Sequence, residues 1–330
     1  MLSATEGASF PIVTYDDFLL AQKRLDSSII KTPLMRSSFL SEMIRGDVYL
    51  KFEHMQMTHS FKARGALLKL LSLSEEEQKQ GVMTVSAGNH GKALAYFASK
   101  MGIGSFVVMP EQTPLNKVHA CQSYGAQTLL HGQTFEEAFE KGQNLAEELN
   151  MIFVHPYEDP VIITGQGTLG IELVEQYKPY FDAVILPIGG GGLAAGVGRV
   201  LGARWPMCDV FGVQSTYAPF FAASLFCYRS NAPRPATTIA EGIAIKSPGA
   251  LTQHMLRNIL SDIFVVEEDS IKKAVHYLMT EEKQVVEGAG AAGIAALMEN
   301  KHAFYKKKVG IVLCGGNIDA TRLSDILSEQ

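Results

Sequence analysis

The sequence predicts an α/β fold built on largely parallel sheets. Strand-like and helix-like segments alternate along almost the whole chain, and repeated strand-then-helix units are typical of parallel sheets. Three of the predicted strands end in glycine-rich turns that lead onward from the sheet. At 330 residues the chain is long enough for two domains, or for a large domain with a smaller one inserted in it.

The first half of the chain is arranged around a helix that carries a lysine. Residues 15–25 have the spacing of an amphipathic helix, with Thr14 as its N-cap. Ser60 is also a good N-cap, and strong helix formers follow it as far as Leu71, so Lys62 is expected in the first turn of a helix. The other elements expected here are strands at 48–53, 82–85, 105–109, 127–130 and 152–155, and helices at 91–100, from Pro114 onward and at 134–149.

The second half continues the same alternation. The uncharged stretch 183–198 contains Pro187 and four consecutive glycines, a composition that cannot hold a membrane-spanning helix. The elements expected here are strands at 183–188, 210–214, 263–266 and 309–313, helices at 171–177, 193–201, 270–280 and 289–299, and a clear loop at 231–235.

Composition and charge exclude several classes of function. A net charge of -5 and a pI near 6.0 give no support for binding to nucleic acid or to an anionic membrane. The first six residues lack the basic region and apolar stretch of a signal peptide, so a cytoplasmic protein is expected. The cysteines are scattered and the histidines form no metal-type pair, so neither a disulfide framework nor a metal site is expected.

The glycine-rich turns mark the expected ligand-binding edge, because ligands of open α/β sheets bind outside the carboxyl ends of strands. Gly189–Gly192 has no side chains, so its amides can converge on a phosphate at a helix N-terminus. Taken alone, such a run is explained equally well by a tight turn. Residues 86–90 offer backbone amides, the Ser86 hydroxyl and the Asn89 amide, which suits a carboxylate.

Lys62 is the candidate nucleophile. A helix N-terminus disfavours the protonated form of a lysine, and a lysine that loses its proton easily can form a Schiff base with a carbonyl. A solvated helix lysine is the alternative when this residue is considered alone. Together with two anion-binding turns, however, an activated lysine describes a site for a phosphorylated carbonyl cofactor and an amino acid.

Over nearly its whole length the chain resembles the fold-type II pyridoxal-phosphate enzymes, in particular the threonine dehydratase and serine racemase group. The motifs that carry the resemblance occur in the family's order, at 60–66 (lysine), 86–90 (substrate loop), 165–168, 189–193 (phosphate loop), 240–242 and 314–317. The resemblance implies a tryptophan synthase β-like fold of two parallel-sheet α/β domains. It divides the chain into a large domain at 1–78 and 152–330 and a smaller inserted domain at 79–151.

The resemblance also implies roles for the site residues. Lys62 would hold pyridoxal 5'-phosphate and then act as base on the α-carbon of an amino-acid substrate. Phe61 would lie near the cofactor ring, and Asn89 would bond the ring hydroxyl. The implied cofactor contacts are Phe61, Lys62, Asn89, Gly189, Gly190, Gly191, Gly192, Leu193, Gly242 and Cys314, and the implied substrate contacts are Ser86, Ala87, Gly88, Asn89 and His90.

Cys314 departs from the family's usual serine or threonine facing the pyridine nitrogen. A thiol is a weak neutral donor that would not keep this nitrogen protonated, so a carbanion is less stabilised. This favours prompt loss of a β-hydroxyl, with a buried inert thiol as the alternative. Glu241 and Glu287 either face the cofactor or are solvated or capping acids, and Arg64 is expected to be structural.

Residue 87 is the position that best separates a racemase from a dehydratase. A racemase needs an acid–base group on each face of the α-carbon, and the family's racemases have a serine here. Ala87 has no proton to give, which favours a dehydratase. The acids of the racemases' divalent-cation site align with Gln214 and Phe220, which are poor ligands, so no such site is expected.

We therefore expect a dehydratase that converts L-threonine, and L-serine too, to a keto acid and ammonia. The alternatives are a serine racemase, a dehydratase for hydroxyaspartate or phenylserine, and a non-catalytic binding protein on the same fold. The chain ends soon after Asn317, so a short catabolic form without a regulatory domain is expected. A homodimer or homotetramer is expected from the resemblance alone.

Overall fold

Two sheets form the frame of the molecule. The computed structural model describes residues 13–230 and 237–329, and both the loop predicted at 231–235 and the first six residues lie outside them. The larger sheet has six strands, in the spatial order β1 (Leu34–Ser37), β2 (Asp47–Lys51), β10 (Lys308–Val312), β7 (Ala183–Pro187), β8 (Asp209–Ser215) and β9 (Asp262–Val266). All its neighbouring strands are parallel except β1 and β2.

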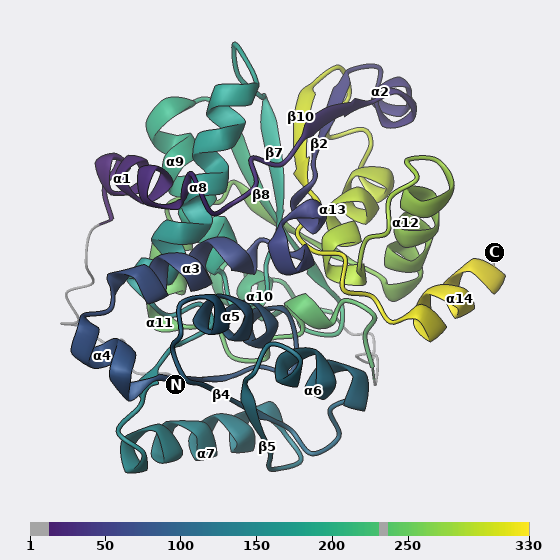
Figure 1. Cartoon of the computed structure of the whole chain (residues 1–330). Helices are drawn as coiled ribbons and strands as arrows, with labels where there is room; N and C mark the ends of the chain where they lie inside the picture. Colours follow the sequence, from purple (N-terminus) through teal and green to yellow (C-terminus); the bar gives the residue numbers. More distant parts are fainter. Residues whose placement is uncertain (1–12, 231–236, 330) are drawn as a thin grey trace.

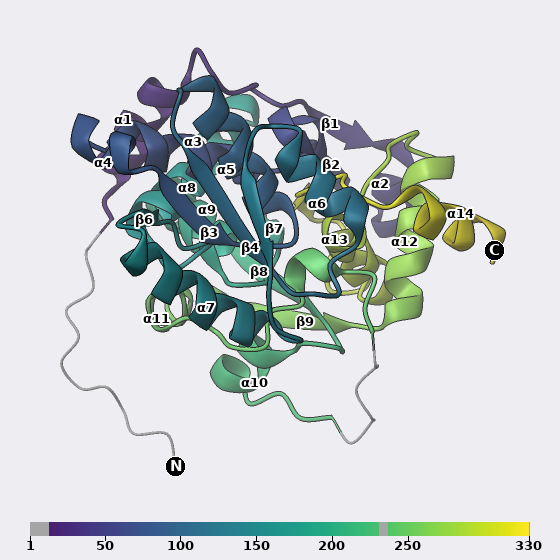
Figure 2. The same ribbon diagram turned by 60° about the horizontal axis from the view of Figure 1, so that its bottom comes forward.

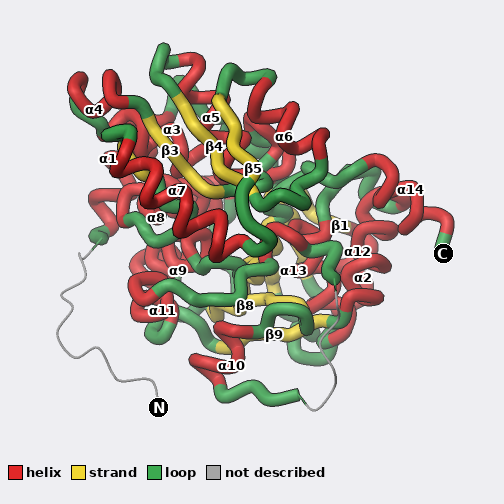
Figure 3. Tube along the Cα trace, turned by 90° about the horizontal axis from the view of Figure 1, so that it is seen from below, coloured by secondary structure: helices red, strands yellow, loops and turns green. Residues whose placement is uncertain are grey.

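The smaller sheet has four strands, and all of them are parallel. Their spatial order is β5 (Gln127–Leu130), β4 (Ser105–Met109), β3 (Val82–Val85) and β6 (Ile152–Phe153). Figure 3 shows strands of both sheets from below, with β3, β4 and β5 in one half of the molecule and β8 and β9 in the other.

Helices cover the two sheets. Those up to residue 176 are α1 (Tyr15–Leu25), α2 (Ser38–Ile44), α3 (Lys62–Ser72), α4 (Glu75–Gln80), α5 (Asn89–Lys100), α6 (Leu115–Gln122), α7 (Phe135–Glu148) and α8 (Pro160–Gln176). The later ones are α9 (Gly192–Arg204), α10 (Phe220–Phe226), α11 (Ala250–Leu256), α12 (Glu268–Thr280), α13 (Gly288–Glu299) and α14 (Ala320–Ser328). Helices α5, α6 and α7 lie with the smaller sheet (Figure 1), and α7 runs along one face of β3 and β4 (Figure 2).

The alternation of strands and helices is confirmed, and α1 has the predicted bounds. Thr14 caps α1 through a reciprocal pair of hydrogen bonds with Asp17. The short elements β1, α2, α4, α10, α11 and α14 were not predicted. The largest error concerns α8, which was predicted to begin at Ile171 but begins at Pro160, with Asp159 as its N-cap.

Glycines inside α8 explain this error. Glycine weakens a helix, so the motif at 165–168 does not predict one. In the structure a Cβ on Gly165 would lie 2.6 Å from the Cα of Gly65 in α3, and a Cβ on Gly196 in α9 would lie 2.7 Å from the backbone nitrogen of Gly167. The backbones of α3, α8 and α9 therefore pack against each other directly. This packing sets the lysine helix and the helix after the four-glycine turn side by side with α8.

A buried network of charges ties the lysine helix to its surroundings. Arg64, in the first turn of α3, donates to both carboxylate oxygens of Glu53 at 2.7 and 2.8 Å and to Glu172 at 2.7 Å. Lys51 donates to the other oxygen of Glu172 at 2.5 Å. All four side chains are buried, and the two cations balance the two anions. The structural role expected for Arg64 is confirmed.

The two sheets are compatible with the predicted domain division, but the limits of the domains stay a prediction. Strand β6 belongs to the smaller sheet through its pairing with β3, although its residues 152–153 lie just outside the predicted segment 79–151. Within the described residues no helix is long and apolar enough to cross a membrane. Four free cysteines are found, two of them buried.

Candidate active site

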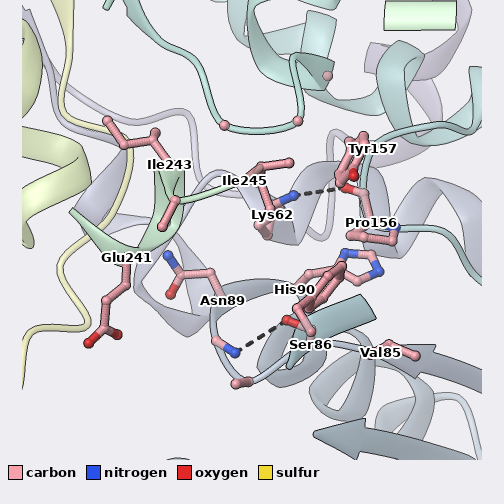
Figure 4. A pocket seen from close by; sticks show the side chains of 18 of the residues that line it. Lys62, Val85, Ser86, Asn89, His90, Pro156, Tyr157, Glu241, Ile243 and Ile245 are labelled. Atoms are coloured by element: carbon pink, nitrogen blue, oxygen red, sulfur yellow. Dashed lines mark hydrogen bonds between the residues drawn. The ribbon is translucent and has the colours of Figure 1, made fainter. Parts of the chain in front are cut away.

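A cavity of about 970 Å³ lies where the strands of both sheets end. Figure 4 shows part of its wall, with Lys62 beside Pro156 and Tyr157, and with Asn89 and Ser86 below. The structure brings every predicted site residue to this one cavity, whose lining includes Phe61, Lys62, Ser86, Ala87, Gly88, Asn89, His90, Gly189, Gly190, Gly191, Gly192, Leu193, Gly242 and Cys314. Segments far apart in the sequence thus meet at one point.

Lys62 is the first residue of α3, and its amine faces the cavity. The Nζ atom donates a hydrogen bond to the carbonyl oxygen of Pro156 at 2.8 Å. Burial lowers the pKa of Lys62 to about 8, and Cys314 opposes this shift only in part. A substantial fraction of the amine is therefore neutral near pH 8, which suits a nucleophile or a base.

The helix begins one residue later than a Ser60 cap would place it, so that prediction was wrong. Ser60 is extended and pairs with Gly315, and the Phe61 amide donates to the Cys314 carbonyl at 3.0 Å. The Ser60 hydroxyl is buried and makes no hydrogen bond within the described residues. Pairing with the segment after β10 takes precedence over local capping. It places Phe61 and Lys62 directly beside Cys314.

The four-glycine turn leaves a helix N-terminus open to the cavity. Gly191 is the N-cap of α9, with a φ of 89° that favours glycine, and no side chain caps this helix. The first backbone N–H groups of α9 are thus available to an anion. Next to it a Cβ on Gly190 would lie 2.1 Å from the ring of Tyr157. Only glycine fits against that ring.

The turn at 86–90 forms a second helix N-terminus. Helix α5 begins at Asn89, two residues earlier than predicted, and its N-cap Gly88 provides no side chain. The Ser86 hydroxyl accepts a hydrogen bond from the Gly88 amide at 3.2 Å (Figure 4). Burial and the nearby Lys62 charge hold the pKa of His90 well below 6.5, and an interaction with the Val154 backbone does not offset this. His90 is therefore neutral.

Cys314 and Glu287 lie together at the end of β10. Burial raises the pKa of the Cys314 thiol well above 9, so it stays neutral, as expected. Burial likewise raises the pKa of Glu287 to about 7, although Asn89 donates to its carboxylate at 2.7 Å. Both acids whose position the sequence left open line the cavity, and Glu287 is the one that lies beside Asn89 and Cys314. The carboxylate of Glu241 points away from Lys62 (Figure 4) and pairs with cations on α6 and α14.

Sequence reasoning missed the 155–157 segment. His155 Nδ1 accepts hydrogen bonds from the amides of Tyr157 and Glu158 at 3.2 and 2.9 Å, so the other ring nitrogen carries the proton. Burial lowers the pKa of His155 to about 4. These residues follow the end of β6, and their position at the carboxyl end of a strand was the available signal.

Gln214, which the resemblance matches to an acid of the racemases' cation site, makes two hydrogen bonds within the protein. Its side-chain oxygen accepts from the Ala222 amide at 2.9 Å, and its nitrogen donates to the Ile188 carbonyl at 3.3 Å. In the part of the chain that the structure describes, no group of three or more histidine, cysteine or acidic residues is placed to hold a metal ion.

Comparisons with known proteins show the family of this chain. A family model described as pyridoxal-phosphate dependent enzyme matches residues 25–315. The L-threonine ammonia-lyase of Thermotoga maritima is 41% identical over 318 residues, which is 96% of this chain and 79% of that protein. The solved T.th. threonine deaminase has a TM-score of 0.85 at 37% identity, and covers 93% of this chain and 99% of its own. The serine racemase of Dictyostelium discoideum has a TM-score of 0.84 at 35% identity, with the same coverage.

Proposed function

The chain belongs to the family of pyridoxal-phosphate dependent enzymes, and on this premise we propose that it is an ammonia-lyase acting on L-threonine and L-serine. The products would be ammonia with 2-oxobutanoate or pyruvate. The observation that carries the proposal is the Lys62 amine, placed between two anion-binding turns in one cavity. The relatives named threonine ammonia-lyase and threonine deaminase support the choice of substrate.

The residues present fit the cofactor. The uncapped N-terminus of α9 suits its phosphate, and the easily deprotonated Lys62 suits its aldehyde. A cavity of about 970 Å³ has the volume of a small-molecule site. Phe61 and Cys314 line the same wall as Lys62, where a ring held by that lysine would lie.

When bound, the cofactor supplies an electron sink for the carbanion left by loss of the α-proton. The neutral Nζ of Lys62 takes that proton, because its lowered pKa makes it a competent base near neutral pH. Backbone amides at 86–90 hold the substrate carboxylate and so fix the α-carbon near Lys62. The neutral Cys314 thiol would give the ring nitrogen no anionic partner to keep it protonated, which favours prompt departure of the β-hydroxyl.

A product assay tests this proposal. The purified protein, loaded with pyridoxal phosphate, is incubated with L-threonine, L-serine and D-serine, and keto acid, ammonia and D-serine are measured. Keto acid and ammonia from L-threonine, without D-serine from L-serine, are expected. Turnover of none of these substrates by a cofactor-loaded protein would contradict the assignment of substrate and favour another β-hydroxy amino acid.

Ala87→Ser is expected to create a racemase activity. The serine hydroxyl adds a proton donor to the cavity wall, and a positioned acid–base group contributes roughly 10²-fold or more. We expect D-serine formation from L-serine to rise by about that factor, measured by chiral chromatography. Ala120→Ser, at another cavity-lining alanine, is the control and should form no D-serine. Abundant D-serine from the unaltered protein would contradict the argument that Ala87 disfavours racemase activity.

Gly190→Ala is expected to weaken cofactor binding. The added Cβ meets the Tyr157 ring, so the turn must shift away from its anion-binding geometry. Losing one charge-assisted hydrogen bond corresponds to a dissociation constant raised about tenfold to 100-fold. Titration of the apo-protein with pyridoxal phosphate measures it. Gly202→Ala, an open and exposed position of α9, is the matched control and should bind normally. Equal affinities for both variants would exclude the turn as the phosphate site.

The finer properties of the protein also belong to this proposal. We expect a cytoplasmic enzyme that forms a homodimer or homotetramer, with the domain limits 1–78 with 152–330 and 79–151. Analytical ultracentrifugation of the full chain would establish the oligomeric state.

A further inference from the structure

A chain of aligned hydrogen bonds runs along one side of the cavity. Lys92 Nζ donates to Oδ1 of Asn317 at 2.7 Å, and Nδ2 of Asn317 donates to Oδ1 of Asn89 at 2.7 Å. Nδ2 of Asn89 in turn donates to Glu287 Oε1 at 2.7 Å. Lys92 and Asn317 both line the cavity, yet neither has a role in the proposed reaction.

The donors and acceptors in this series of hydrogen bonds can be ordered in only one direction. The ammonium of Lys92 has no acceptor, so it requires the carbonyl end of the Asn317 amide. The nitrogen of Asn317 must then face Asn89 and the carbonyl oxygen of Thr58, to which it donates at 2.9 Å. The oxygen of Asn89 is thereby engaged by Asn317. Its amino group can only point the other way.

The amino group of Asn89 points into a confined space beside Cys314. A Cβ on Gly315 would lie 3.1 Å from Nδ2 of Asn89 and 2.5 Å from Oε1 of Glu287, so the pair lies directly over this glycine. Nδ2 carries two hydrogens, and Glu287 Oε1 accepts one of them. The second remains for an acceptor in the cavity.

We propose that Lys92 and Asn317 are positioning residues that hold the amide of Asn89 with its N–H groups toward an oxygen on the cofactor ring. The inference rests on the proposed function, in which Asn89 bonds the ring hydroxyl. A reversed Asn89 amide would present a carbonyl oxygen to that ring oxygen, and two acceptors facing each other repel. Lys92 prevents the reversal from a distance, through the orientation of Asn317.

Asn317→Asp tests the inference, because it keeps the shape of the side chain and removes its donor. Two acceptors would then meet at Asn89 Oδ1, so the Asn89 amide is expected to reverse. Lys92 still has an acceptor partner in Asp, which favours a folded protein. Lys92→Met removes the cation but keeps an unbranched side chain in this half-buried position. Lys100→Met, at the exposed end of the same helix, is the control.

The first readout is the dissociation constant of pyridoxal phosphate from the full-length apo-protein. We expect it to rise about tenfold for N317D and about threefold to tenfold for K92M, and to stay unchanged for K100M. The second is the absorbance of the bound cofactor. Loss of the N–H donor disfavours the ionised ring oxygen, so intensity should move from the long-wavelength to the short-wavelength band. A role in stability alone would not move this band.

Two outcomes separate the failure of this inference from that of the proposed function. An unaltered protein that does not bind pyridoxal phosphate would contradict the proposed function itself. N317D and K92M with the affinity and spectrum of the unaltered protein would overturn only the positioning role. Thermal unfolding of each apo-protein establishes whether the variants fold. If N317D does not fold, the affinity and spectrum of K92M test the positioning role.

Discussion

Replacing Lys62 by alanine is expected to lower kcat/KM for L-threonine by about 10³-fold or more, equivalent to about 4 kcal/mol of transition-state stabilisation. The reason is the combined loss of the amine that would hold the cofactor and of the base for the α-proton. Its Nζ donates to the Pro156 carbonyl, lies over the Phe61 ring and has a pKa of about 8. Release of 2-oxobutanoate and ammonia measures the effect.

A second lysine of α3 provides the matched control. Lys69 forms an ion pair with Asp159 at 2.7 Å and does not line the cavity. Lys69→Ala should keep kcat/KM within about twofold, since a partly exposed ion pair is worth little. Borohydride reduction followed by peptide mass spectrometry should attach the cofactor to Lys62 alone. Substantial turnover by Lys62→Ala, or labelling at another lysine, would contradict the assignment.

Replacing Arg64 by methionine is expected to lower the free energy of unfolding by about 3–5 kcal/mol, because it leaves a buried carboxylate without its cation. Arg64 and Glu53 are 1% and 0% exposed, and two hydrogen bonds join them. The loss is a large part of the roughly 5–15 kcal/mol that typically stabilises a domain. Denaturant unfolding of the apo-protein followed by circular dichroism measures it.

Two further variants serve as controls for the stability loss expected of Arg64→Met. Arg36→Met removes an ion pair with Asp47 whose side chains are 44% and 42% exposed, and should cost less than about 1 kcal/mol. Adding Glu53→Gln to Arg64→Met should recover part of the loss, since one cation and one anion then remain in the network. Equal costs for Arg64→Met and Arg36→Met would show that burial of the network contributes nothing.

The stability difference should also depend on pH. Burial alone would raise the pKa of Glu53, but the charge and hydrogen bonds of Arg64 hold it below 4.5. In the unaltered protein this contribution is present above the unfolded pKa and is lost only as the pH falls through the lower, folded value. Without Arg64, burial raises the pKa of Glu53 in the folded variant above its value in the unfolded chain. Acid then protonates Glu53 and removes the cost of a buried carboxylate that has lost its cation. The difference should therefore shrink as the pH falls from neutral toward the ordinary carboxyl value of 4.5, and a constant difference would contradict the explanation.

The sequence predicted the candidate site because each of its parts has a local signature. A predicted strand followed by a glycine-rich turn indicated ligand-binding turns at Gly189–Gly192 and at residues 86–90. Both turns line one cavity. Lys62 was recognised as the first-turn lysine of a helix. The 155–157 segment and Lys92 were missed, because a histidine, a tyrosine or a lysine has no such signature on its own. What these residues do depends on which segments face them.

The sequence by itself therefore determined the elements whose stability is local. Capping of α1 by Thr14, the strand at Val82–Val85 and the open turn before α9 all follow from neighbouring residues. The tertiary structure alone decided the start of the lysine helix and the direction of the Asn89 amide. The first depends on pairing with residues 314 and 315, and the second on Asn317, which is 228 positions away. The tertiary structure also decided the lowered pKa of Lys62, because the surrounding chain is what buries this amine.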